Sequence, residues 1–208
     1  MHSPEIPTPR GPAGVDVTEP AGEPAAMLVL GHGAGGGVDA PDLTRIRSAA
    51  VAAGLRVVLV TQPYRVAGRR SPPPAGHLDE AWTAVVREIA DPDLPLVLGG
   101  RSSGARVACR TAAGLGAAAV LALAFPLHPP GRPERSRAAE LPERLPTLVV
   151  NGDRDPFGVP EPVGQVEVIV RPGAKHDLRK DLAATAEQVI AWLGRHGWTD
   201  AGRNARSR

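Results

Sequence analysis

Six short, continuously apolar runs recur along the chain and alternate with segments of helical periodicity. The runs are residues 27–30, 57–60, 96–98, 119–125, 147–150 and 166–170. Strands of a parallel sheet are apolar on both faces because helices cover both sides, whereas a strand with one wet face alternates apolar and polar residues. The pattern therefore predicts an α/β domain in which helices connect parallel strands.

Apolar residues at helical spacing mark the segments between these runs. Pro41 suits the first turn of a helix and Gly54 a carboxyl cap, so the two residues bracket a helix over 42–53. Two further stripes have the same spacing. They consist of Leu78, Ala81, Trp82, Val85 and Ile89, and of Leu182, Ala186, Val189, Ile190 and Leu193. We expect helices on both faces of a mostly parallel sheet of about six to seven strands.

The chain of 208 residues is long enough for one domain with a sizeable core. We expect that domain to span residues 25–197. Residues 1–24, rich in proline and glycine, are predicted to be an extended lead-in with room for a short strand at 15–17. Residues 198–208 are predicted to be a polar tail. Residues 126–145 contain five prolines and are predicted to be a short excursion over one end of the sheet rather than a large cap domain.

Composition excludes several classes of protein. The net charge is only +2 and the arginines are scattered, which argues against a nucleic-acid partner. Cys109 is the single cysteine, so an intrachain disulfide is excluded. No apolar run approaches the roughly 20 residues that span a bilayer, and the amino terminus lacks the apolar core of a signal peptide. We expect a cytoplasmic protein that does not insert into membranes.

Three polar clusters each begin where a predicted strand ends. They are "GGRSSG" at 99–104, "NGDRDPFG" at 151–158 and "RPGAKHDL" at 171–178. In open parallel sheets, ligands bind outside the carboxyl ends of the strands, where groups distant in sequence converge. The clusters are therefore candidates for one functional site.

The first cluster fits the pattern G-x-S-x-G between a strand and a helix. In this register Ser102 is the nucleophile, with glycines two residues to either side that let strand and helix approach closely. A frame centred on Ser103 would need glycine at Arg101 and Ala105, and it fails. The alternative is a turn of small residues that serves packing alone.

A serine hydroxyl needs a base to take its proton, and the base needs an acceptor that holds it in the right tautomer. His176 follows the last predicted strand and is the favoured base. The competitors are His128, in the excursion, and His77, at the start of a helix.

The second cluster offers two carboxylates. Asp155 precedes Pro156 and is better placed to reach across to His176, so we assign Asp153 to the turn itself. A metal site or a pair of glycosidase carboxylates is the alternative, but the sequence supplies no further ligands and we expect neither metal nor cofactor. The order serine, acid, base is that of α/β hydrolases.

The stretch "GHGAGGG" at 31–37 contains G-x-G-x-x-G after a strand, so a dinucleotide fold must be considered. That fold requires an acidic residue at the end of the next strand, which here ends "VLVTQPY". An oxyanion hole explains the glycines better, with the backbone N–H of Ala34 as one donor and that of Ser103 as the other. His32 is predicted to be structural.

Residues that contact substrate are predicted at the same edge. The candidates are Gly35, Arg101 and His128. Arginines on the expected active-end loops would favour an anionic substrate, although in an arginine-rich chain they are more simply solvated. These arginines are Arg65, Arg69, Arg70, Arg101, Arg132, Arg135 and Arg171.

The segments "VLGHGAGG", "LGGRSSGARVA", "FPLHPPGRPE", "LVVNGDRDPFG" and "GAKHDL" together resemble the small, lid-poor α/β-hydrolase family related to dienelactone hydrolases, which includes the testis-expressed hydrolase-like proteins. The resemblance spans roughly residues 25–195. It implies an α/β-hydrolase fold with Ser102, Asp155 and His176 as catalytic triad. Gly104 is the second glycine of the G-x-S-x-G turn, and Ala105 follows it where many relatives have a further glycine. Some relatives serve as scaffolds.

The expected function is hydrolysis of an ester or thioester of a small acyl substrate through an acyl-Ser102 intermediate. The rival interpretation is a catalytically silent scaffold or binding protein on a hydrolase fold. The sequence leaves the acyl group, the leaving group and the oligomeric state open.

Overall fold

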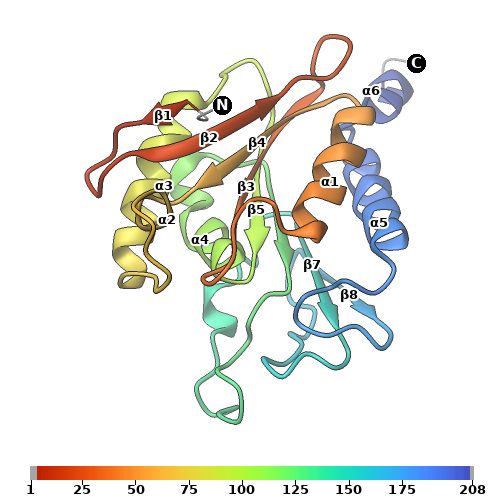
Figure 1. Cartoon of the computed structure of the whole chain (residues 1–208). Coiled ribbons are helices and arrows are strands. Elements are labelled where there is room, and N and C mark those ends of the chain that lie inside the picture. The colour runs from red at the N-terminus through yellow and green to blue at the C-terminus, as the bar shows by residue number, and fades with distance from the viewer. Residues whose placement is uncertain (1–3, 207–208) are drawn as a thin grey trace.

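The computed structural model describes residues 4–206, and its centre is one twisted sheet of eight strands with helices on both faces (Figure 1). Along the sheet the strands follow the order β1-β2-β4-β3-β5-β6-β7-β8. Strands β3 to β8 pair in parallel, and β1 and β2 extend the sheet antiparallel beside β4. The strands are β1 (Glu5–Ile6), β2 (Ala13–Thr18), β3 (Ala26–Gly31), β4 (Leu55–Thr61), β5 (Leu96–Arg101), β6 (Ala119–Leu123), β7 (Thr147–Gly152) and β8 (Val166–Arg171).

The helices lie in two layers. Helices α1 and α5 pack together on one face, and α3 and α4 pack on the other (Figure 1). The helices are α1 (Pro41–Ala52), α2 (Pro63–Val66), α3 (Ala75–Ile89), α4 (Ser103–Thr111), α5 (Leu182–Arg195) and α6 (Asp200–Arg206), with 3₁₀ turns at Ala113–Leu115 and Ala138–Glu140.

The strands are continuously apolar because helices cover both faces of the sheet, as the sequence suggests. Strands β3, β6 and β7 are buried along their whole length. Val29 belongs to the core under α3 and α4, while its neighbours Leu28 and Leu30 belong to the core under α1 and α5. Because successive side chains point to opposite faces, a sheet covered on both sides needs apolar residues at every position.

The structure adds strands to the predicted six or seven. The lead-in, residues 1–24, supplies β1 and β2, and Val15 pairs with Val60 of β4. The sequence indicated only a short strand there, because its flanking prolines and glycines resemble a loop. Residues 1–3 lie outside the described residues.

The expected polar tail, residues 198–208, also differs from the structure as far as residue 206. Helix α6 forms there, and the Asp200 N–H donates to the carbonyl oxygen of Ala53 at 3.0 Å. Trp198 packs edge-on against Trp192 of α5. This tertiary packing outweighs the polar composition of the segment.

The excursion at 126–145 is a loop with one 3₁₀ turn and forms no cap domain. Glu140 in that turn pairs with Arg106 and Arg110 of α4, which ties the loop to the helix that follows β5. Within residues 4–206, no helix is both long and apolar enough to cross a membrane. Among residues 4–206, the chain that follows β6 therefore adds a loop and no separate domain at the carboxyl ends of the parallel strands.

We predict that Gly104→Ala will destabilise the fold. A Cβ at Gly104 would run into the backbone carbonyl of Gly31 at the end of β3, and overpacking against backbone typically costs about 1–3 kcal/mol. The measurement is the free energy of unfolding from a denaturant titration.

Gly114→Ala is the matched control, because a Cβ there would meet no atom within 4 Å. It should be neutral or stabilising by up to about 1 kcal/mol. Equal stability of the two alanine variants would show that the close approach of β3 and α4 is not what requires glycine at position 104.

Candidate active site

Ser102 occupies the single residue between the end of β5 and the start of α4. Its backbone has φ 54° and ψ −110°, a conformation that residues with a Cβ rarely adopt. The Ser102 N–H donates to the carbonyl oxygen of Leu123 at 2.9 Å, which anchors the turn to β6. The structure therefore holds this serine in the strained geometry that the motif predicts.

The three predicted triad residues lie in one hydrogen-bonded chain. The Oγ of Ser102 is 2.9 Å from Nε2 of His176, and Nδ1 of His176 is 2.8 Å from Oδ2 of Asp155. The Asp155 carboxylate is fully buried, whereas 18% of the His176 side chain is exposed. Because Nδ1 faces a carboxylate and carries the proton, Nε2 of the neutral ring is free to accept from the serine.

The two neighbouring carboxylates have different partners. The second oxygen of Asp155 accepts from the N–H of Phe157 at 2.9 Å, so both of its oxygens are bonded. Asp153 instead accepts from the N–H of Gly173 at 2.6 Å and joins the turn after β7 to the turn after β8. The structure brings Asp155, and not Asp153, to the histidine.

Two contacts that sequence reasoning missed hold the loop of His176. The ring of Phe157 lies 4.2 Å, between centroids, from the imidazole. Arg101 donates from Nη2 to the carbonyl oxygen of His176 at 3.2 Å. No spacing rule connects these positions, because the contacts depend on how loops from three strands meet.

Arg101 also reaches back to helix α1. Its Nε lies 2.9 Å from Oδ2 of Asp42, a carboxylate that is almost completely buried. Burial raises the pKa of Asp42, and the Arg101 charge opposes that rise. Arg101, which the sequence suggested as a substrate contact, therefore has its guanidinium engaged by the carboxylate of Asp42 on α1 and by the backbone of the His176 loop.

The predicted oxyanion donors lie in the loop after β3 and at the start of α4. Ser103 is the first residue of α4, and the N–H groups of a first helical turn have no acceptor inside the helix. The positive end of the helix dipole also favours binding of an anion at the N–H of Ser103. Ala34 lies in the loop after β3, and its carbonyl oxygen accepts from the Tyr64 hydroxyl at 2.7 Å.

His32 fixes the start of the same loop. Its Nδ1 donates to the carbonyl oxygen of Gly33 at 2.8 Å, and its Nε2 accepts from the N–H of Gln62 at 3.0 Å. Burial lowers the pKa of His32, so the ring stays neutral in this position. These contacts suit the structural role that the sequence suggested.

The other two predicted substrate contacts lie on opposite loops. Gly35 follows Ala34, and a Cβ there would meet no atom within 4 Å, so the backbone is open to a ligand. His128 donates from Nδ1 to the carbonyl oxygen of Pro129 at 2.9 Å. Its backbone N–H donates to the carbonyl oxygen of Phe157, which places it against the loop that carries Asp155.

Two other kinds of reactive site, a metal centre and a reactive cysteine, were considered among residues 4–206. No group of three or more histidine, cysteine, aspartate or glutamate side chains is arranged to hold a metal ion within that range. Cys109 on α4 is buried, and burial raises the pKa of its thiol to about 12. A thiol with that pKa is a poor nucleophile at neutral pH.

Comparison with solved structures shows the same fold. A lid-less α/β serine hydrolase from Xanthomonas campestris is 22% identical over 97% of both chains, with a TM-score of 0.77. An α/β serine hydrolase homologue from Coxiella burnetii is 23% identical over 93% of this chain and 98% of that chain, with a TM-score of 0.73. Dienelactone hydrolase from Anabaena variabilis is 19% identical over 92% and 95%, with a TM-score of 0.72.

The sequence profile of a family described as "Alpha/beta hydrolase domain" matches residues 24–192. None of the curated proteins searched matches significantly. Since the profile covers most of the chain, the protein belongs to the α/β hydrolase family, as the sequence motifs predicted.

The burial of neutral His32 predicts a pH-dependent stability. An unfolded histidine has a pKa of about 6.5, so below that pH the unfolded chain takes up a proton that folded His32 resists. Unfolding therefore becomes easier as the pH falls through this range. We expect the melting temperature of His32→Gln to fall less than that of the wild type between about pH 7.5 and about pH 5.5.

His77→Gln, at a half-buried position on α3, controls for the loss of an imidazole, and the difference between the two variants isolates the part of the pH dependence that belongs to His32. An NMR titration of wild-type His32 gives a second measurement that does not depend on a variant. If His32 takes up its proton near pH 6.5, as an exposed histidine does, the account of its burial is wrong.

Proposed function

We propose that the protein is a serine hydrolase that cleaves an ester or thioester of a small acyl substrate through an acyl-Ser102 intermediate. The observation that carries this proposal is the hydrogen-bonded chain from Ser102 through His176 to Asp155, at the carboxyl edge of a hydrolase sheet. The dienelactone hydrolase among the structural neighbours is named for a cyclic ester, which agrees with ester chemistry.

The proposed first half of the reaction forms the acyl-enzyme. Ser102 Oγ attacks the acyl carbon while Nε2 of His176 takes the hydroxyl proton. The Asp155 carboxylate stabilises the imidazolium that results, and its complete burial strengthens this interaction. The imidazolium then protonates the departing alkoxide or thiolate as the bond from the acyl carbon to the leaving group breaks.

The second half repeats these steps with water. His176 takes a proton from water as the water oxygen attacks the acyl carbon. It then returns that proton to Ser102 Oγ as the bond from the acyl carbon to Oγ breaks and the carboxylic acid leaves. In both halves the negative oxygen of the tetrahedral intermediate is proposed to accept from the N–H groups of Ala34 and Ser103. Removing one such donor from other enzymes lowers turnover by about 10²–10³-fold, so these N–H groups carry a large share of catalysis.

Residues 4–206 form no cap domain over Ser102, so we propose that the loops around the serine hold the small acyl group. Gly35 and His128 are proposed substrate contacts on either side of the serine. Arg101 is assigned a positioning role instead, since it links the loop of His176 to buried Asp42.

We predict that Ser102→Ala will abolish both labelling by a fluorophosphonate probe and hydrolysis of p-nitrophenyl acetate. The alanine variant lacks the Oγ that would attack, while its fold is preserved, because a methyl side chain replaces the hydroxymethyl group. Labelling is followed by intact-protein mass spectrometry and hydrolysis by absorbance.

Ser103→Ala is the matched control. It changes the neighbouring hydroxyl but keeps the backbone N–H that is the proposed oxyanion donor, so both readouts should stay close to wild type. Hydrolysis that persists in folded Ser102→Ala, or that is lost in Ser103→Ala, would contradict the choice of nucleophile.

Substitution of each carboxylate tests which one acts on His176. Asp155→Asn should lower turnover by up to about 10⁴-fold, because an amide cannot hold the reactive tautomer of His176 or stabilise its cation. Asp153→Asn should mainly lower stability, since it weakens the bond to the N–H of Gly173. Turnover is measured per folded molecule, with folding checked by thermal melts.

A catalytic loss in Asp153→Asn together with near-normal turnover in Asp155→Asn would reject the assignment of the acid.

A further inference from the structure

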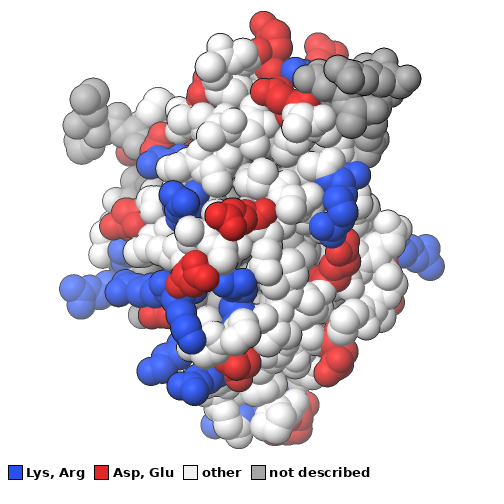
Figure 2. Space-filling model, turned by 90° about the vertical axis from the view of Figure 1, so that its right-hand side faces the viewer, with Lys and Arg blue, Asp and Glu red and all other residues white. Residues whose placement is uncertain are grey.

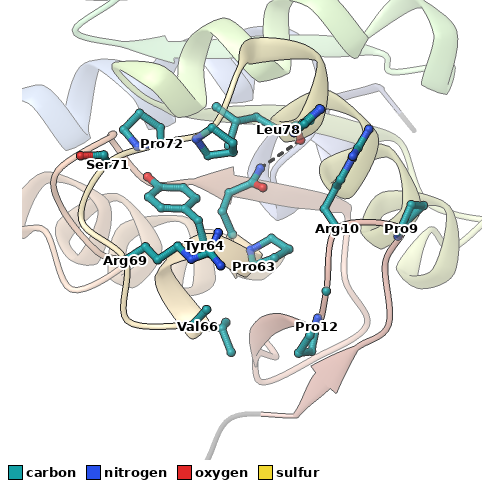
Figure 3. Close-up of a pocket in the computed structure, with 15 residues that line it drawn as sticks. Pro9, Arg10, Pro12, Pro63, Tyr64, Val66, Arg69, Ser71, Pro72 and Leu78 are labelled. Carbon is teal, nitrogen blue, oxygen red and sulfur yellow. Dashed lines mark hydrogen bonds between the residues drawn. The ribbon is translucent and has the colours of Figure 1, made fainter.

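A pocket of about 530 Å³ lies beside the proposed oxyanion loop (Figure 3). Three segments form it: the turn between β1 and β2, the start of α2, and the approach to α3. Ser102, Asp155 and His176 do not line it. Its volume is typical of sites for small molecules. The lining residues are Pro9, Arg10, Gly11, Pro12, Gln62, Pro63, Tyr64, Val66, Ala67, Arg69, Ser71, Pro72, Pro73, His77 and Leu78.

Apolar and stiff residues form much of the pocket wall. Buried Leu78 and the ring of Tyr64 form part of the wall, and Figure 3 shows the ring and several prolines around the same space. Proline has a fixed φ, so walls built from it lose little entropy when a ligand binds. The prolines are Pro9, Pro12, Pro63, Pro72 and Pro73. Such a wall suits a flat apolar group that can pack against an aromatic ring.

The charge of the lining has one sign. None of the fifteen lining residues is acidic, and two are arginines. Arg10 is engaged, because its guanidinium lies 2.6 Å from Glu80. Arg69 forms no ion pair with any residue in the described range 4–206, and Figure 3 shows its side chain running toward the middle of the pocket.

The backbone of Arg69 is fixed although its side chain is exposed. Its N–H donates to the carbonyl oxygen of Tyr64 at 2.8 Å, and Arg65 donates to its carbonyl oxygen at 3.3 Å. A guanidinium presented from a fixed backbone matches the two oxygens of a carboxylate and can donate two parallel hydrogen bonds to them.

We infer that this pocket binds a carboxylate with a flat apolar body, as a second ligand distinct from the ester cleaved at Ser102. The carboxylate pairs with Arg69 and the apolar body packs against Tyr64 and the prolines. Tyr64 also donates to the carbonyl oxygen of Ala34, and Gln62 donates to His32. The ligand therefore contacts residues that hold the proposed oxyanion loop.

Isothermal titration with a matched pair of ligands tests the inference. The probes are 2-naphthylacetate and its neutral counterpart 2-(2-naphthyl)ethanol, and neither contains an ester. The wild type should bind the acid about two- to fivefold more tightly than the alcohol, the ratio expected of an exposed ion pair. Arg69→Gln should remove that preference.

Arg70→Gln is the matched control, since Arg70 is the exposed neighbour of Arg69 and does not line the pocket. It should keep the preference. Ala67→Trp, which fills the pocket from its rim, should weaken binding of both probes. The inference is overturned if the wild type binds acid and alcohol equally, if Arg70→Gln loses as much affinity as Arg69→Gln, or if Ala67→Trp binds as the wild type does.

A carboxylic acid is also the product of the proposed reaction, so the two sites must be told apart. Ser102→Ala and protein already labelled by the fluorophosphonate should bind 2-naphthylacetate with the wild-type affinity. A large loss of affinity in the labelled protein would place the acid at Ser102 and overturn the separate site. The Arg69 and Arg70 comparison needs no catalysis, so its result stands even if the proposed hydrolysis fails.

Discussion

The close approach of three glycines determines where the reactive groups lie. Gly31 ends β3, while Gly100 and Gly104 lie two residues before and two residues after Ser102. A Cβ at Gly100 would lie 2.5 Å from the carbonyl oxygen of Gly31, and one at Gly104 would run into the same group. Without side chains at these positions, α4 can begin directly beside β3. Ser102 then projects between the loop after β3 and the loop that carries His176.

In place of a cap, hydrogen bonds and ion pairs between loops hold the site. Arg101 joins the loop of His176 to Asp42 on α1. The side chain of Asn151 bonds both backbone groups of Phe125 and the carbonyl oxygen of Gly158, which fixes the acid loop to the end of β6. On the side of the molecule that carries α5, charged side chains gather mainly over one half of the face, and a largely uncharged strip runs beside them (Figure 2). This agrees with the alanine-rich groove between α1 and α5, lined by Ala49, Ala53, Ala186 and Ile190 among others.

The sequence was informative where local chemistry decides the structure. Runs of apolar residues predicted six strands, because burial of a strand on both faces is visible over a few residues. Glycine spacing favoured Ser102 over Ser103 as the nucleophile, because the backbone of a tight turn also depends on a few residues. Strand β1 and helix α6 were missed because their residues gain stability only from distant partners, such as Ala53 for Asp200. The roles of Arg101 and Phe157 around His176 escaped prediction for the same reason, since no sequence spacing relates the loops that meet there.

The proposed mechanism requires that Ser102 becomes acylated during turnover. The most direct measurement is peptide mapping by mass spectrometry of the protein quenched in acid within milliseconds of mixing with p-nitrophenyl acetate. We expect one acetyl group, on the peptide that contains Ser102, formed as fast as p-nitrophenolate is released. Release of p-nitrophenolate with the acetyl group on another residue, or undiminished release by protein whose Ser102 is already labelled by the fluorophosphonate, would contradict acylation of Ser102.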